Sequence, residues 1–180
     1  WCHNPESQKN EPEMLCDRTR CSGCGVCRTV CPNGAIELRG GEMRSVSGRC
    51  KACGRCSEDC LSGARQLAGR RYTLTDLVKL VERDRPFYEE SGGGVTLSGG
   101  EALSQGEAAA ALAEELSRRG IHVALDTCGH CPPETLRKLL PWTDLFLYDL
   151  KHMDAKLHRR YTGQDNALIL QNLRLLLESG

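Results

Sequence analysis

The residues best suited to chemistry are the cysteines, of which the 180-residue sequence has 12. Most of them fall in two runs that share the spacing C-x2-C-x2-C-x3-C. These runs are Cys21, Cys24, Cys27 and Cys31, then Cys50, Cys53, Cys56 and Cys60. Thiolates repeated every third residue can converge on one soft-metal centre, which a disulfide framework does not require. The spacing therefore predicts metal ligands in a reducing compartment, the cytoplasm.

The repeated spacing resembles the cysteine run of bacterial ferredoxins. There, three cysteines of one loop bind one four-iron cluster, and the fourth begins the next short helix and binds the other cluster. On this template we expect one [4Fe–4S] cluster on Cys21, Cys24, Cys27 and Cys60. We expect the other on Cys50, Cys53, Cys56 and Cys31.

Zinc is the alternative metal. A four-cysteine zinc site would fit Cys21, Cys24, Cys50 and Cys53. That choice leaves the other cysteines of the two runs without a task, so the two-cluster interpretation is favoured.

Four further cysteines lie outside the template, and one of them, Cys2, belongs to a motif described below. Cys16 is interpreted as a buried or incidental thiol. Cys128 and Cys131 form a C-x2-C pair at the end of an expected strand. Such a pair is either a redox or metal site or two small residues in a tight loop, and the second interpretation is favoured.

From about residue 70 the sequence alternates between helical and strand patterns. Helices are expected over 73–84, with Thr75 as N-cap, then over 104–120, 132–142 and, as one or two helices, 154–180. Strands are expected over 94–100, 122–129 and 144–151. Short connections between alternating elements predict a parallel sheet with crossover helices, in a complete or partial β/α barrel. Chemistry in such folds sits where the strands end, here at SGGE, DTCG and DLK.

Several motifs together resemble one family. They are WCHNPE at residues 1–6, the two cysteine runs, GVTLSGGE, ALDTCG, and DLK followed by His158. The chain resembles the activating enzymes of glycyl radical enzymes, in the branch of the radical S-adenosylmethionine (SAM) superfamily that carries a two-cluster ferredoxin insert. The resemblance covers the whole chain. It implies an α/β fold, a partial radical SAM barrel from residues 1–15 and 66–180, and an insert at residues 16–65.

The resemblance also gives the N-terminal residues a role. Cys2 matches the third cysteine of the family's C-x3-C-x2-C hallmark, and Trp1 and His3 match cofactor-binding neighbours. Three thiolates leave one iron of a cluster open, and by resemblance that iron binds SAM. The first two hallmark cysteines are not in the sequence. We therefore expect a fragment truncated at both ends and inactive by itself.

By the same resemblance, the strand ends bind SAM. The implied cofactor-binding residues are Ser98, Gly99, Gly100, Glu101, Asp126, Asp149, Leu150 and Lys151. Asp149 and Lys151 are also the implied catalytic residues, and Lys151 is expected to pair with the SAM carboxylate. Ala102 replaces the usual proline after SGGE. The alternatives are a plain strand-to-helix turn at SGGE and a structural ion pair between Asp149 and Lys151.

Two further implications concern the surroundings of this site. A monovalent cation is expected near Asp126, Thr127 and Asp149, because carboxylates and carbonyls suit a hard cation. His158 is expected to orient the site or the partner protein.

The implied function is reductive cleavage of SAM and abstraction of hydrogen from a glycine of a glycyl radical enzyme, in an anaerobic cell. An electron donor such as flavodoxin or ferredoxin is implied. With 24 basic and 24 acidic residues the chain gives no reason to expect nucleic acid or an anionic membrane as partner. No apolar run approaches the roughly 18 residues of a membrane span. The alternatives are a ferredoxin-type electron carrier and a radical SAM enzyme with another substrate.

Overall fold

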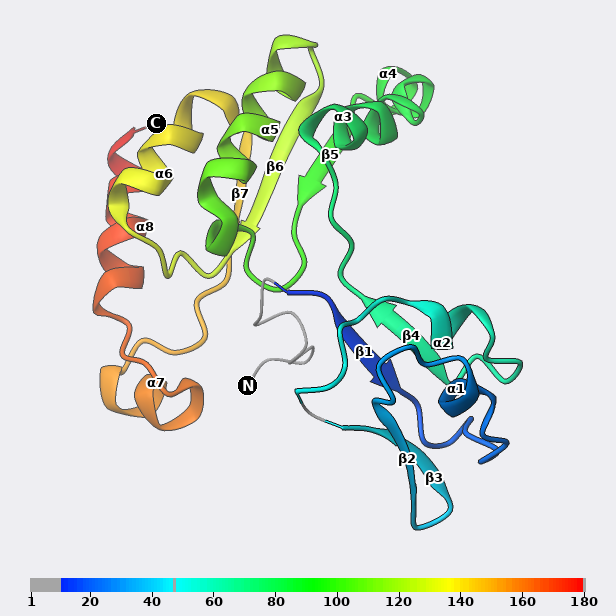
Figure 1. The fold of residues 1–180 in the computed structure, drawn as a ribbon. Coiled ribbons are helices and arrows are strands. Elements are labelled where there is room, and N and C mark those ends of the chain that lie inside the picture. The colour runs from blue at the N-terminus through cyan, green and yellow to red at the C-terminus, as the bar shows by residue number, and fades with distance from the viewer. Residues whose placement is uncertain (1–10, 47, 180) are drawn as a thin grey trace. The chain divides into compact units, whose positions relative to one another are not determined.

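The computed structural model describes residues 11–46 and 48–179. The hallmark residues Trp1, Cys2 and His3 lie outside this range, so their predicted roles stay predictions. The chain divides into two compact units, a cysteine-rich unit that ends at Arg71 and an α/β unit that begins at Tyr72. Both units are drawn in Figure 1.

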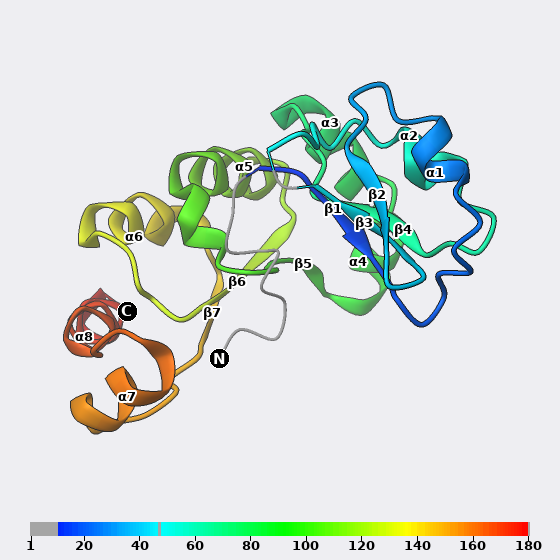
Figure 2. The same ribbon diagram turned by 60° about the horizontal axis from the view of Figure 1, so that its bottom comes forward.

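The cysteine-rich unit is built from two small antiparallel sheets and two short helices. Strand β1 (Glu13–Cys16) pairs with β4 (Arg65–Ala68), and β2 (Ile36–Arg39) pairs with β3 (Glu42–Ser45). The helices are α1 (Val26–Thr29) and α2 (Arg55–Glu58), which lie next to each other (Figure 2). In the β1–β4 register, Cys16 stands opposite Arg65. None of these strands was expected from the sequence, because each is only four residues long.

The two cysteine runs adopt the same local structure. Each helix begins after a glycine in the left-handed conformation, Gly25 with φ 82° and Gly54 with φ 86°. This conformation is open to glycine at little cost. The helices contain the third cysteine of each run, Cys27 and Cys56, and both side chains are buried. The expectation that the fourth cysteine begins a helix is wrong, because each helix has ended before the chain reaches it.

The α/β unit contains a three-stranded parallel sheet in the order β5 (Gly94–Leu97), β6 (His122–Thr127), β7 (Leu145–Tyr148). Its helices are α3 (Leu74–Glu82), α4 (Arg85–Ser91), α5 (Gly106–Arg118), α6 (Pro133–Leu139), α7 (Ala155–Thr162) and α8 (Ala167–Ser179). Short 3-10 turns cover Ala102–Gln105 and Leu140–Trp142. A parallel sheet with crossover helices confirms the predicted α/β fold class and is consistent with a partial β/α barrel.

The strands are shorter than expected, and each ends before the expected segment is complete. The chain leaves the sheet after Leu97, Thr127 and Tyr148, so SGGE, the second half of DTCG and DLK lie in the loops beyond. Parallel strands end at the same edge of a sheet, so these loops share one rim.

The observed helices differ from the expected ones at α3 and α4, while the stretch from residue 154 agrees with the expected one or two helices. Thr73, not Thr75, caps α3, because its hydroxyl accepts a hydrogen bond from the backbone N–H of Asp76 at 3.1 Å. Helix α4 was not expected. The stretch from residue 154 onward contains two helices, separated by a turn at Gly163 with φ 85°.

The core of the α/β unit is aliphatic. Helix α5 packs along β6 and against α6 (Figure 1). Fully buried leucine and valine side chains fill the space between them: Leu116, Val123, Leu125, Leu136 and Leu139. Burial of this kind supplies the largest favourable contribution to folding.

Across residues 11–46 and 48–179, no helix combines the length and the apolar character that a membrane span needs.

Candidate functional site

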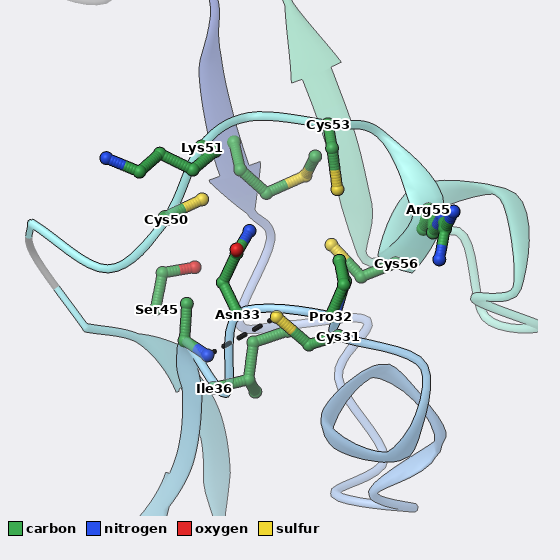
Figure 3. A pocket seen from close by; sticks show the side chains of 12 residues that line it. Cys31, Pro32, Asn33, Ile36, Ser45, Cys50, Lys51, Cys53, Arg55 and Cys56 are labelled. Carbon is green, nitrogen blue, oxygen red and sulfur yellow. Dashed lines mark hydrogen bonds between the residues drawn. The ribbon is translucent and has the colours of Figure 1, made fainter.

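Four cysteines of the cysteine-rich unit line one pocket. They are Cys31 from the first run and Cys50, Cys53 and Cys56 from the second. Figure 3 shows their sulfur atoms directed toward a common space, with Pro32 and Ile36 beside them. This is the crossed set that the ferredoxin template predicts for one cluster, in which the fourth ligand comes from the other run.

Backbone amides support two of these thiols. The N–H of Ala35 donates to Cys31 Sγ at 3.3 Å, drawn as a dashed line in Figure 3. The N–H of Ala52 donates to Cys50 Sγ at 3.5 Å. Ala52 has a φ of 47°, which is uncommon for a residue with a side chain and marks a loop held in a strained turn. N–H groups aimed at sulfur stabilise thiolates and tune clusters, so this donor set fits a [4Fe–4S] group.

Two members of the other predicted set, Cys21 and Cys60, lie beside β3 and β4. The backbone N–H groups of Met43 and Gly23 hold the pKa of the Cys21 thiol below its usual range. The hydroxyl of Ser62, 3.5 Å from Cys60 Sγ, lowers the pKa of that thiol, and the N–H groups of Arg65 and Ala64 add to the effect.

Cys27 and Cys24, the remaining members of this set, differ in exposure. Cys27 is buried in the core of the unit, and Cys24 is exposed. Within the described ranges, no three histidine, cysteine or carboxylate side chains form a group that could hold a single metal ion, so the pocket described above is not a single-ion site as it stands.

Cys16 lies beside the same set. Its Sγ contacts the carbonyl of Met43 at 3.6 Å, and burial raises the pKa of its thiol. It is a half-buried thiol next to Cys21, as the sequence interpretation allowed.

At the rim of the parallel sheet, the loop after β5 bonds to the end of β6. Ser98 Oγ donates to Asp126 Oδ2 at 2.7 Å. Gly99 and Gly100 follow with φ values of 87° and 64°, a region that favours glycine. Ser98, Gly99 and Gly100 are exposed, and the two glycines have no side chain that could cover their backbone.

Glu101 connects the same two strand ends through its carboxylate. Oε1 accepts hydrogen bonds from the N–H of Leu103 at 3.0 Å and from the hydroxyl of Thr127 at 2.6 Å. Oε2 accepts from the N–H of Cys128 at 2.9 Å. Thr127 is buried and its Oγ1 also accepts from Gly129 N–H. Sequence reasoning missed this bridging role, because a carboxylate bound across 26 residues leaves no local signal.

The DLK segment continues from β7. The N–H of Asp149 donates to the carbonyl of Thr127 at 2.9 Å, which holds Asp149 at the rim. Its carboxylate forms an ion pair with Lys151, and both side chains are partly exposed, 45% and 35% respectively. Leu150 lies between them and is half-buried.

His158 has a structural role. Its side chain is buried, and Nδ1 lies 2.7 Å from the carbonyl of Gln164 and 3.1 Å from Thr162 Oγ1. The imidazole thus stabilises the turn between α7 and α8. The described contacts of His158 join it to this turn and not to Asp149 or Lys151.

The Cys128–Cys131 pair has the properties of packed thiols. Burial, with Glu101 nearby, raises the pKa of Cys128 to about 12, and burial raises the pKa of Cys131 to about 11. Asn172 donates to the carbonyls of Gly129 and Cys131, both at 2.8 Å. Because the thiolate is the reactive and metal-binding form, this environment favours the tight-loop interpretation.

We predict that Glu101→Gln destabilises the chain by about 1–3 kcal/mol, because an amide has one acceptor oxygen where the carboxylate has two. The NH2 group of the introduced amide then faces a donor that a carboxylate oxygen of Glu101 had accepted from. Urea denaturation measures the change in unfolding free energy. Glu107→Gln is the matched control, since Glu107 is exposed and pairs with Lys138 at the surface, and it is expected to change stability by about 0.5 kcal/mol or less. Equal effects of the two variants would contradict the bridging role.

We also predict slow alkylation of Cys128 and Cys131 by iodoacetamide. A raised pKa keeps a thiol protonated until the pH approaches that value. At pH 8 both should react at least about 100-fold more slowly than an unperturbed cysteine of pKa about 8.5. The rates should rise about tenfold per pH unit up to pH 10, read by mass spectrometry of the folded chain. Labelling at the rate of a free thiol at pH 8 would exclude the packed environment.

Comparison with protein families gives two matches. The radical SAM superfamily model matches residues 43–180, and the 4Fe-4S binding domain model matches residues 17–37.

Curated relatives are similar along the whole chain. The trans-4-hydroxy-L-proline dehydratase activating enzyme of Clostridioides difficile is 46% identical, covering 100% of this chain and 60% of the relative. The isethionate sulfite-lyase activating enzyme of Desulfovibrio desulfuricans is 43% identical, covering 99% and 59%. The benzylsuccinate synthase activating enzyme of Thauera aromatica is 40% identical, covering 100% and 56%. The chain thus spans about three fifths of the length of these relatives.

A solved structure, a domain of pyruvate-formate lyase-activating enzyme from Bacteroides vulgatus, is 37% identical with a TM-score of 0.45. The match covers 48% of this chain and 54% of that one. The superfamily match covers most of the residues described above, including the three strand ends and the second cysteine run. The chain belongs to the radical SAM superfamily.

Proposed function

We propose that this chain is part of an activating enzyme that uses SAM to generate a radical on a glycine of a partner enzyme. The observation that carries the proposal is the arrangement at the sheet rim. SGGE, DTCG and DLK follow three adjacent parallel strands, and hydrogen bonds link the first to the second and the second to the third. The relatives named above are all activating enzymes and are similar to the entire chain, which supports the same assignment.

The rim residues divide into a support and a binding surface. Glu101 is occupied by three donors and fixes the loop, while Ser98, Gly99 and Gly100 present exposed backbone. Exposed N–H and carbonyl groups at consecutive glycines allow a ligand to approach closely. We assign this backbone to the methionyl amino group of SAM.

Asp149 and Lys151 supply the charged part of the surface. Because the ion pair between Asp149 and Lys151 is partly exposed, replacing one partner by a charged group of a ligand costs little free energy. Lys151 can turn from Asp149 to the carboxylate of SAM while Asp149 faces the amino group or a monovalent cation. Asp126 and Thr127 complete the proposed cation position, with Leu150 beside the cofactor.

The auxiliary cysteines are proposed to hold two [4Fe–4S] clusters in the crossed arrangement. The pocket shared by Cys31, Cys50, Cys53 and Cys56 supports one of them, because a single zinc ion on Cys21, Cys24, Cys50 and Cys53 would leave Cys31 and Cys56 without a role. Bound SAM and its cluster supply the radical chemistry, while the chain binds and orients them. An electron donor such as flavodoxin or ferredoxin and a cytoplasmic location belong to the same proposal.

The full-length protein that contains this sequence is predicted to cleave SAM reductively under anaerobic conditions. With its cognate glycyl radical enzyme it should also produce a doublet in the electron paramagnetic resonance (EPR) spectrum. Product analysis and EPR with and without the partner measure the two steps. Reducible clusters without SAM cleavage would establish the electron-carrier alternative, and cleavage without a partner radical would indicate another substrate.

Lys151→Ala is predicted to weaken SAM binding by about 10- to 100-fold in the same protein, the loss expected when a charged hydrogen bond is removed. Calorimetric titration of the cluster-loaded protein with SAM measures it. The matched control is Lys156→Ala, which removes an exposed lysine at the start of α7 and should leave the affinity unchanged. Unchanged affinity in Lys151→Ala would remove that residue from the site.

A further inference from the structure

Arg65 places a positive charge inside the cysteine-rich unit. The residue is 3% exposed. Its Nη2 donates to the carbonyl of Met43 at 2.6 Å, and Nη1 donates to Ser45 Oγ at 2.9 Å. Nε is buried and has no hydrogen-bond partner among the described residues. Within residues 11–46 and 48–179, no carboxylate forms an ion pair with Arg65.

Such an arrangement is costly unless a negative group completes it. Removing a guanidinium from water loses hydration that two neutral acceptors only partly replace. A buried N–H without a partner adds a further penalty of about 1–3 kcal/mol. The missing partner must therefore be sought among the groups around the side chain.

Those groups include thiols of both predicted sets, among which Cys27 interacts most strongly with Arg65 and Cys56 more weakly. The N–H of Arg65 itself approaches Cys60 Sγ, and Met43, whose carbonyl Arg65 binds, directs its N–H to Cys21. Cys27 is buried in the same core cluster as Met43. Cys16 stands opposite Arg65 in the strand register and contacts the same Met43 carbonyl. Three of these cysteines belong to the set predicted for one cluster, Cys21, Cys24, Cys27 and Cys60.

We propose that Arg65 is the buried counter-charge of the [4Fe–4S] cluster held by Cys21, Cys24, Cys27 and Cys60, and that it raises the reduction potential of that cluster. The inference rests on the cluster binding proposed above. Arg65 acts here as a positioning residue, through its charge and its spare Nε–H, and is not a cluster ligand.

The direction of the effect follows from charge. Four thiolates give a four-iron cluster a net negative charge, which grows by one on reduction. A nearby cation stabilises the reduced form more than the oxidised form, and hydrogen bonds to the sulfurs act in the same direction. Removing the cation therefore makes the cluster harder to reduce.

The test compares Arg65→Met, Arg65→Lys and Arg44→Met with the unmodified protein after anaerobic reconstitution with iron and sulfide. Arg44 is the matched control, because it lies on β3 next to Met43 but is exposed and pairs with Glu42 at the surface. Iron and sulfide per chain are measured first, followed by an EPR-monitored redox titration of the auxiliary clusters. Unmodified protein that fails to bind about eight irons in these clusters contradicts the cluster proposal itself.

In protein that loads, Arg65→Met should shift one auxiliary cluster to a more negative potential, or should lose that cluster. Arg65→Lys, which keeps the charge, should load and stay close to the unmodified potential, and Arg44→Met should match it. The inference is overturned if Arg65→Met loads with unchanged potentials, or if Arg65→Lys shows as large a shift or loss as Arg65→Met. These outcomes would leave Arg65 with a packing role only.

Discussion

A polar group that leaves water must find a partner inside the protein, and this constraint organises both units of the chain. In the α/β unit the carboxylate of Glu101 satisfies it completely, with donors from Leu103, Thr127 and Cys128. Those bonds fix the loop after β5 against the end of β6. The loop can then present its glycine backbone while its acidic side chain is engaged elsewhere. The rim is preorganised because its support is separate from its exposed surface.

In the cysteine-rich unit the same constraint is met in part. Backbone N–H groups reach the sulfurs of Cys31 and Cys50, and Met43 and Gly23 supply N–H groups to Cys21. Arg65 retains a buried N–H without a partner. A small core in which thiols and two methionines outnumber the aliphatic side chains, with a buried guanidinium beside it, is a poor hydrophobic core by itself. It is well suited to an anionic inorganic group, which would satisfy the charge and the amides together.

Sequence reasoning succeeded where the signal is local or strongly periodic. Apart from α4, the order of helices and strands after residue 70 was predicted because each element has its own pattern, and the strand ends identified the rim. It failed for β1 to β4, which are four residues each. Strand β1 pairs with the distant β4, whereas β2 and β3 form a local hairpin across Gly40 and Gly41 that was missed. It also assigned the N-cap of α3 to Thr75 instead of Thr73, since both threonines stand at the start of the same helical pattern and only the backbone conformation separates them.

The sequence by itself determined the chemistry available: which thiols repeat, which strands end in polar residues, and which family the motifs resemble. Tertiary structure decided which of these groups meet. It placed Cys31 with the second cysteine run and made the carboxylate of Glu101 a bridge between two strand ends. It also bonded His158 to the turn after α7 and buried Arg65 beside thiols. The physical reason is that hydrogen bonds and charge pairing act over a few ångströms in space, across 26 residues for Glu101 and Thr127, where no local pattern records them.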